Sequence, residues 1–197
     1  MPRTHHLARC TGALVALACI ALAGCSAGAV ETTVDSASRA PSRTASASTA
    51  PGEPAQVAIP SIGVASSLMR LGLNKDGTVQ VPPADKGMTA GWYTGGAVPG
   101  ERGAAVIIGH NDTRFGKAVF HDLKKITKGA DIAVRTTRGT TAHFTVTGTE
   151  TVSKSAFPTE RVYGATGERA LRLITCSGDF DEQGHPVDNL IVYATLR

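Results

Sequence analysis

Cys176 is the residue in this sequence whose type and setting most directly suggest chemistry. The other three cysteines all lie near the N-terminus, at positions 10, 19 and 25. Cys176 ends a β-rich run, 171–176, and is followed by Ser177-Gly178, so its thiol is predicted at the end of a strand beside a turn. Such a thiol can be a nucleophile, and it can equally be a small buried hydrophobic side chain. The residue alone leaves both interpretations open.

A nucleophilic thiol needs a partner acid or base, and four histidines follow residue 100. His110 comes directly after an apolar run, where a buried strand gives way to a polar turn, a place that suits catalysis. His121 and His143 have settings typical of structural residues. His185, in the loop after Cys176, is the rival candidate. Asp112 could orient His110 or cap its own turn.

Short β-rich runs separated by turn signals make up the chain from residue 57 onward. The run 104–108 is continuously apolar between two glycines, which predicts a strand buried on both faces. Residues 119–126 have the spacing of a short helix. Seven or eight strands with one minor helix favour a mainly β barrel or sandwich. The other predicted strands are 57–60, 66–73, 78–81, 131–136, 142–146, 171–176 and 190–196.

The first 25 residues are predicted to be an export signal. Two arginines and two histidines precede an apolar stretch of residues 10–25, which is short for a membrane span. The stretch ends in Leu22-Ala23-Gly24-Cys25, which resembles the lipobox of bacterial lipoproteins. We expect diacylation of Cys25, because two acyl chains give stable anchoring at the outer face of the membrane. An ordinary cleaved signal and an uncleaved anchor are the alternatives.

Two further regions follow the signal. Residues 26–56 are mostly Ser, Ala, Thr, Pro and Gly without an aromatic side chain, which predicts a disordered tether with a reach of about 30 Å. Residues 57–197 have the size of one domain. In an exported chain of this organisation Cys176 has no partner for an internal disulfide, which raises interest in it as a reactive thiol.

Composition excludes several classes of function. The chain has 20 Lys and Arg against 16 Asp and Glu, and two of the basic residues lie in the signal. No basic block with interleaved aromatic residues follows, so nucleic acid is not an expected partner. No His/Cys cluster has the spacing of metal ligands, and no glycine-rich phosphate loop occurs, so neither a metal nor another cofactor is predicted.

A series of segments, in order along residues 57–197, resembles the sortase family, and most closely the class F sortases of actinobacteria. The resemblance implies an eight-stranded sortase β-barrel with one or two short helices. It further implies that Cys176 attacks a sorting-signal peptide, with His110 as acid and base, and that the acyl group passes to a peptidoglycan precursor amine or to water. The segments are Ile59-Pro60-Ser61-Ile62-Gly63, 72–83, Gly91-Trp92-Tyr93, Pro99-Gly100, Ile107-Ile108-Gly109-His110, Val119-Phe120 and Leu173-Ile174-Thr175-Cys176.

The third catalytic position departs from the family pattern. Most sortases have an arginine at the start of the final strand, where this sequence places Asn189. Arg172 is the other candidate, because in an extended strand it shares the face of Ile174 and Cys176. We predict a catalytic role for Arg172. Substrate or oxyanion contacts are predicted for Asn189, Ile174 and Thr175. By the same alternation the Thr175 hydroxyl is expected to steady its strand.

Two other functions remain to be weighed. A cysteine L,D-transpeptidase of the cell wall also combines an export signal with one Cys and one His, although its usual Ser-His-Gly-Cys stretch is replaced here by Ile174-Thr175-Cys176-Ser177. A non-catalytic lipoprotein binding module would use the barrel only to present a surface.

Overall fold

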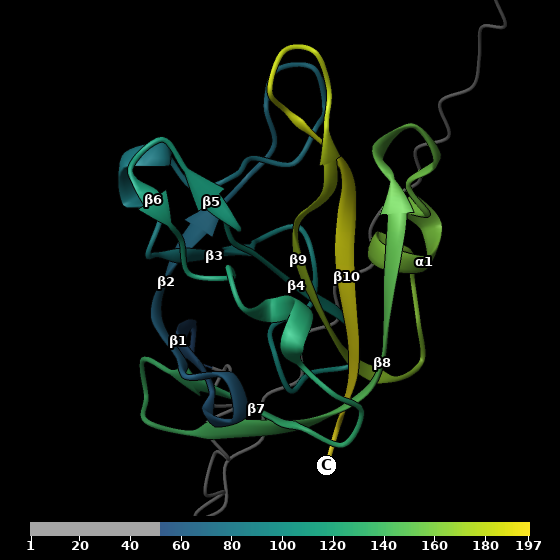
Figure 1. Cartoon of the computed structure of the whole chain (residues 1–197). Helices are drawn as coiled ribbons and strands as arrows, with labels where there is room; N and C mark the ends of the chain where they lie inside the picture. Colours follow the sequence, from purple (N-terminus) through teal and green to yellow (C-terminus); the bar gives the residue numbers. More distant parts are fainter. Residues whose placement is uncertain (1–51) are drawn as a thin grey trace, which may run out of the picture. The chain divides into compact units, whose positions relative to one another are not determined.

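The computed structural model describes residues 52–197. The predicted signal 1–25 with its lipidation site Cys25, and the predicted linker as far as residue 51, lie outside the described residues. The described part contains ten strands, one α-helix and four short 3-10 helices (Figure 1). The strands are β1 (Pro54–Ile59), β2 (Val64–Leu71), β3 (Ala90–Tyr93), β4 (Gly103–Ile108), β5 (Asp112–Thr113), β6 (Gly116–Lys117), β7 (Asp131–Thr136), β8 (Thr141–Ser153), β9 (Arg169–Phe180) and β10 (Pro186–Leu196). The helices are η1 (Pro60–Ile62), η2 (Ala84–Lys86), η3 (Leu123–Lys125), η4 (Lys154–Ala156) and α1 (Thr159–Tyr163).

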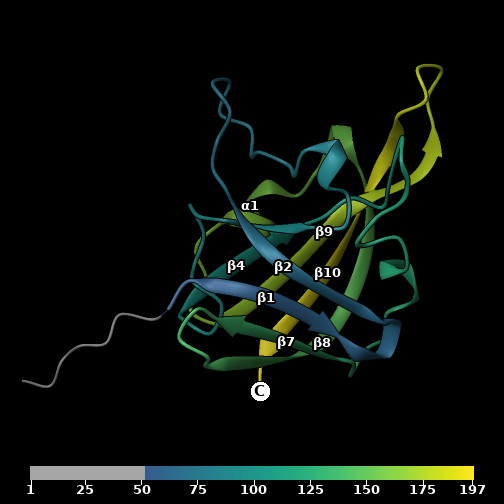
Figure 2. The same cartoon turned by 90° about the vertical axis from the view of Figure 1, so that its left-hand side faces the viewer.

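Eight of these strands close into a barrel in the order β1-β2-β3-β4-β9-β10-β8-β7. The pairs β2–β3 and β4–β9 are parallel, and the other neighbours are antiparallel. Figure 2 shows β1 and β2 crossing the near side of the barrel, with β4, β9 and β10 behind them. The predicted mainly β, eight-stranded barrel is therefore confirmed. Within residues 52–197, no helix has the length and hydropathy needed to cross a bilayer.

Strand β4 is buried on both faces, as its continuous apolar run predicted. Ala105 and Ile107 belong to the core inside the barrel, which also holds Phe120 and Phe144. Val106 and Ile108 point the other way, into a second cluster on the outer face that includes Val162 of α1. A strand covered on both sides needs apolar residues at every position, which explains the absence of alternation.

Several strand boundaries differ from the sequence-based prediction. Strand β9 continues past Cys176 to Phe180, so the thiol lies within the strand and not at its end. Strand β1 begins at Pro54, so the last three residues of the predicted linker belong to the folded domain, where Gln56 pairs with β2 and β7. Composition did not reveal this because the pairing partners are distant in sequence. The predicted strand 78–81 is reduced to one bridge between Leu73 and Val79, and Val81 is 58% exposed.

Several short elements were not predicted, among them β3, β5, β6 and α1. Strand β3 has four residues and includes Gly91, which weakens its strand signal. That glycine is needed because a Cβ there would lie 2.4 Å from Leu71 Cγ on the paired strand. Helix α1 has only five residues, too few for a helical period to appear in the sequence.

Candidate active site

The strand register brings His110, Cys176 and Asn189 into one row. Strands β4 and β9 are parallel with Ile108 opposite Ile174, so the residues two positions further on are His110 and Cys176. The amide of the intervening Gly109 donates to the Ile174 carbonyl at 3.1 Å, which carries the pairing past the end of β4. On the other side of β9, Asn189 of β10 lies opposite Cys176. Three polar residues thus end up on three adjacent segments spaced about 4.8 Å apart.

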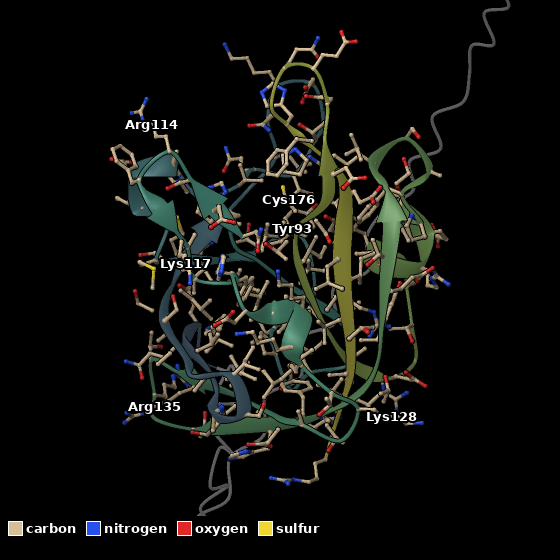
Figure 3. All side chains as sticks on the ribbon, in the orientation of Figure 1. Tyr93, Arg114, Lys117, Lys128, Arg135 and Cys176 are labelled. Carbon is tan, nitrogen blue, oxygen red and sulfur yellow. The ribbon has the colours of Figure 1, made fainter. Side chains whose placement is uncertain are left out.

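All three residues line one groove with a volume of about 790 Å³, which we call the aromatic groove. Its aliphatic side chains come from the segment after β2 and from β4 and β9, and its aromatic side chains come from β3 and the region of α1. The rings pack on one another, with centroids 5.7 Å apart for Tyr93 and Tyr163 and 6.0 Å apart for Phe157 and Tyr163. Figure 3 labels Cys176 and Tyr93 below the loop that joins β9 and β10. The aliphatic members are Leu73, Val79, Val81, Ile108 and Ile174.

The imidazole of His110 is held by the main chain. Its Nε2 atom lies 2.6 Å from the carbonyl oxygen of Pro82. A carbonyl only accepts hydrogen bonds, so Nε2 carries the hydrogen, and in the neutral ring the Nδ1 lone pair is free to take a proton. The Phe120 amide donates to the His110 carbonyl at 2.9 Å. A Cβ at the preceding Gly109 would lie 2.6 Å from the Phe120 ring, so only glycine allows this close packing.

Cys176 is partly exposed and is a free thiol. The neighbouring Thr175 faces the barrel interior and is 3% exposed, and its hydroxyl oxygen has no hydrogen-bond partner in the described chain. The hydroxyl therefore makes no hydrogen bond that would steady the strand, contrary to our expectation. Leaving a buried hydroxyl without a partner costs about 1–3 kcal/mol. Ile174, the third neighbour, is buried and also lines the aromatic groove.

Arg172 does not line the aromatic groove, although it shares a strand face with Cys176. It is 9% exposed, and its guanidinium carbon lies 4.8 Å from the ring centroid of Tyr193. Its Nη1 donates to the Leu171 carbonyl, and its Nε is buried without a hydrogen-bond partner among residues 52–197. Burial lowers the pKa of this guanidinium. Four residues along a strand span about 13 Å, which separates Arg172 from the thiol.

A second, smaller cavity of about 250 Å³ also reaches Cys176 and Thr175, and we call it the polar pocket. Asp112 lines it, and its Oδ1 lies 2.9 Å from His121 Nδ1. The other carboxylate oxygen accepts from Asn111 at 2.9 Å. Asp112 thus orients His121 and not His110. The remaining polar lining comes from Lys124 and Ser177.

Neither His143 nor His185 lines the cavities that contain the thiol. His143 lies 3.1 Å from Asp131, in keeping with a structural role. The His185 side chain is 75% exposed beside Asp181, and it lines neither the aromatic groove nor the polar pocket. Trp92 is buried in the core and only Tyr93 of that pair reaches the groove. In the described part of the chain no group of three or more His, Cys, Asp or Glu could hold a metal ion.

The sequence model of the sortase domain family matches residues 57–197. The chain belongs to the sortase family. Sortases are cysteine transpeptidases of the cell envelope that act on sorting-signal peptides and cell-wall amines, so the predicted enzyme class is confirmed. None of the comparisons favours an L,D-transpeptidase or a non-catalytic binding module.

Solved sortase structures share the fold. Sortase C2 of Group B Streptococcus Pilus Island 1 is 23% identical with a TM-score of 0.56, over 73% of each chain. Sortase C-1 from Actinomyces oris is 23% identical with a TM-score of 0.57, over 73% of this chain and 71% of that one. A Clostridium perfringens sortase D5 transpeptidase is 23% identical with a TM-score of 0.54, over 74% and 79%. A comparison with curated proteins found no significant match.

Two features of this sortase site were missed by sequence reasoning. The Pro82 carbonyl is a main-chain group that every residue type has, so the sequence could not indicate its hydrogen bond to His110. The ring cluster of Tyr93, Phe157 and Tyr163 assembles from distant segments. Exposed apolar residues on both sides of the Asn74–Gly77 turn were the one available signal for the groove wall.

Proposed function

We propose that this sortase uses Cys176 as its nucleophile and His110 as its general acid and base. The observation that carries the proposal is the row of His110, Cys176 and Asn189, which lie just after β4, within β9 and near the start of β10, and which all line the aromatic groove. A partly exposed thiol beside an imidazole, at the rim of a large groove, is the arrangement that acyl transfer through a thioester needs.

The reaction follows from these positions. The Cys176 thiol gives its proton to His110, and Sγ attacks the scissile carbonyl carbon of the sorting-signal peptide. The carbon–nitrogen bond breaks as His110 passes that proton to the departing amine. The acyl group is then held on sulfur as a thioester. An incoming amine or water attacks the same carbon, His110 takes its proton, and the carbon–sulfur bond breaks as that proton passes to the leaving sulfur.

We assign the third catalytic position to Asn189 and not to Arg172. Asn189 is paired with Cys176 across β9 and β10, and its side-chain amide can donate a hydrogen bond to the oxyanion that forms during attack. Arg172 is packed against Tyr193 away from the groove. Because aliphatic and aromatic side chains line the groove, we expect the donor to be an extended peptide with apolar residues.

We further propose that the enzyme is a class F sortase held at the outer face of the membrane by lipid on Cys25. The subclass rests on the segments around Pro82-Pro83, Gly91-Trp92-Tyr93 and Leu173 to Cys176, and the anchor rests on Leu22-Ala23-Gly24-Cys25. Cells fed an alkyne fatty acid should label the wild-type protein and not the Cys25→Ser variant. Equal labelling of the two would exclude lipidation at Cys25.

The catalytic proposal is tested with a library of quenched fluorogenic peptides and mass spectrometry of the intact protein. We expect cleavage of part of the library and an acyl adduct on Cys176. The Cys176→Ala variant should lose both while keeping the wild-type circular dichroism spectrum. Cleavage by that variant at the wild-type rate, or an adduct on another residue, would refute the assignment.

A further inference from the structure

The polar pocket and the aromatic groove meet at the reactive thiol. Cys176 and Thr175 line both cavities, whereas His110 and Asn189 line only the groove. A thioester formed on Cys176 from a peptide in the aromatic groove therefore has a second cavity beside it. Its volume of about 250 Å³ is below that of ordinary ligand sites, and it suits the end of a side chain better than a whole peptide.

The polar pocket carries one group of each charge. The Asp112 carboxylate is bonded to His121 and Asn111, and it retains lone pairs for a further donor. Lys124 also lines the pocket, and its ammonium makes no ion pair within residues 52–197. Its chain neighbour Lys125 differs, since it pairs with Asp122 at 2.9 Å and does not line the pocket.

The hydroxyl of Thr175 is a third, independent sign of a ligand. Thr175 is 3% exposed, and its hydroxyl oxygen has no partner in the described chain. Buried hydroxyls in folded proteins are normally hydrogen-bonded to protein or to ordered water. A polar group that entered the pocket beside Thr175 could supply the missing bond.

We propose that the polar pocket binds the acceptor, and that the acceptor carries a carboxylate on the same carbon as its amine. This inference rests on the proposed role of Cys176. Asp112 attracts the amine, Lys124 binds the carboxylate, and Thr175 offers a hydrogen bond next to the thioester. A pocket for an isolated amine, as in a lysine side chain, would have no use for the unpaired Lys124.

The transfer balances without another reactant. The bound ammonium loses one proton to water, which gives the neutral amine. Its nitrogen bonds to the thioester carbonyl carbon, and the carbon–sulfur bond breaks. The second proton leaves the nitrogen for His110 and then reaches the sulfur, so the products are an amide and the free Cys176 thiol.

The test uses an acyl group that needs no peptide donor. The protein is acetylated at Cys176 with p-nitrophenyl acetate, freed of excess reagent, and mixed with glycine or with glycinamide, in which the carboxylate is capped. The products N-acetylglycine and N-acetylglycinamide are quantified by mass spectrometry. The ratio of the two is compared between variants, so that the different intrinsic reactivity of the two amines cancels.

Lys124→Gln should lower the glycine to glycinamide product ratio about three- to fivefold, the range expected for loss of one exposed ion pair. The matched control Lys125→Gln should keep the wild-type ratio. Asp112→Asn should lower both products together relative to hydrolysis. An unchanged ratio in Lys124→Gln, or the same fall in both lysine variants, overturns the inference while leaving the proposed function standing. Failure of Cys176 to be acetylated overturns both.

Discussion

Two positions on the outer face of β9 differ in their surroundings: Arg172, which we call the covered end, and Cys176, which we call the open end. Arg172 and Cys176 lie on the same face, four residues apart. Arg172 is opposite Tyr193 on β10, whose ring covers the guanidinium, and Arg161 lies over the same ring at 5.5 Å. Cys176 is opposite Asn189, whose small side chain leaves the thiol open to the aromatic groove. The residue across the pair decides whether a side chain on this face is covered or open to the aromatic groove.

The covered end is held by a network of charges. Arg161 pairs with Glu150, and the Tyr193 hydroxyl donates to the same carboxylate at 3.0 Å. The bond to Arg161, followed by that to Tyr193, lowers the pKa of Glu150. These contacts keep Tyr193 in place over Arg172. Strand alternation therefore predicts the face of a residue but not what covers it.

The largest effect on catalysis is expected at the open end, where Asn189 lies opposite Cys176. Asn189→Ala should reduce the rate of thioacyl formation on Cys176 by about 100-fold, because loss of an oxyanion donor costs that much in comparable sites. The rate is measured with the best peptide of the fluorogenic library. Asn189→Asp, which keeps the size but loses the donor, should fall as far. Wild-type rates in both variants would remove Asn189 from the mechanism.

A smaller effect, on folding stability at alkaline pH, is expected from the aromatic rings that line the aromatic groove. Burial, together with the neighbouring Tyr93, raises the pKa of Tyr163 to about 12 from an ordinary value of 10.0. The fold favours the neutral phenol, so this contribution to stability is complete below pH 10 and is lost as the pH rises toward 12. A shift of two units corresponds to about 2.7 kcal/mol, and partial exposure reduces it to about 1 kcal/mol.

Urea unfolding at pH 9 and pH 11.5 measures this loss, and Tyr163→Phe should show a loss smaller by about 1 kcal/mol than the wild-type protein. The exposed-lysine variant Lys128→Gln serves as the control for general alkaline effects. Parallel losses in the wild-type and Tyr163→Phe proteins would mean that the ring is not buried as described.

The smallest effect is expected at the covered end. Arg172→Met removes a buried guanidinium whose Nε has no partner, at the cost of its contact with Tyr193. The two changes oppose each other, so the free energy of unfolding should change by less than about 1 kcal/mol. Thioacyl formation should stay within about twofold of wild type. A fall as large as that of Asn189→Ala would restore Arg172 as the third catalytic residue.

Much of the barrel could be predicted from the sequence because its strands carry local signals. The apolar run of β4, the hairpin of β7 and β8, and the final strands were all visible as runs between turns. Strand β3 and helix α1 were not, because they are short and are stabilised by partners distant in sequence. Cys176 and His110 stood out by residue type, whereas their juxtaposition depends on the parallel register of β4 and β9.

The choice between Arg172 and Asn189 for the proposed third catalytic position depends on contacts that the sequence does not show. The sequence favoured Arg172 because it carries a charge and shares the strand face of Cys176, and the structure has the same alternation. The cover provided by Tyr193 comes from β10, so it could not be read from β9. The polar pocket was invisible for a similar reason, since Asp112, Lys124 and Thr175 come from three separate segments.

The hydrogen bond between His110 Nε2 and the Pro82 carbonyl ties the orientation of the imidazole to the position of residues 79–82, which form one wall of the aromatic groove. Pro82 ends the segment whose Val79 and Val81 line the aromatic groove. Because the acceptor is a main-chain oxygen, no side-chain replacement at position 82 deletes it. A donor peptide that displaced residues 79–82 on entry would also move the hydrogen-bond acceptor of His110, so the orientation of the imidazole would change when the groove is occupied.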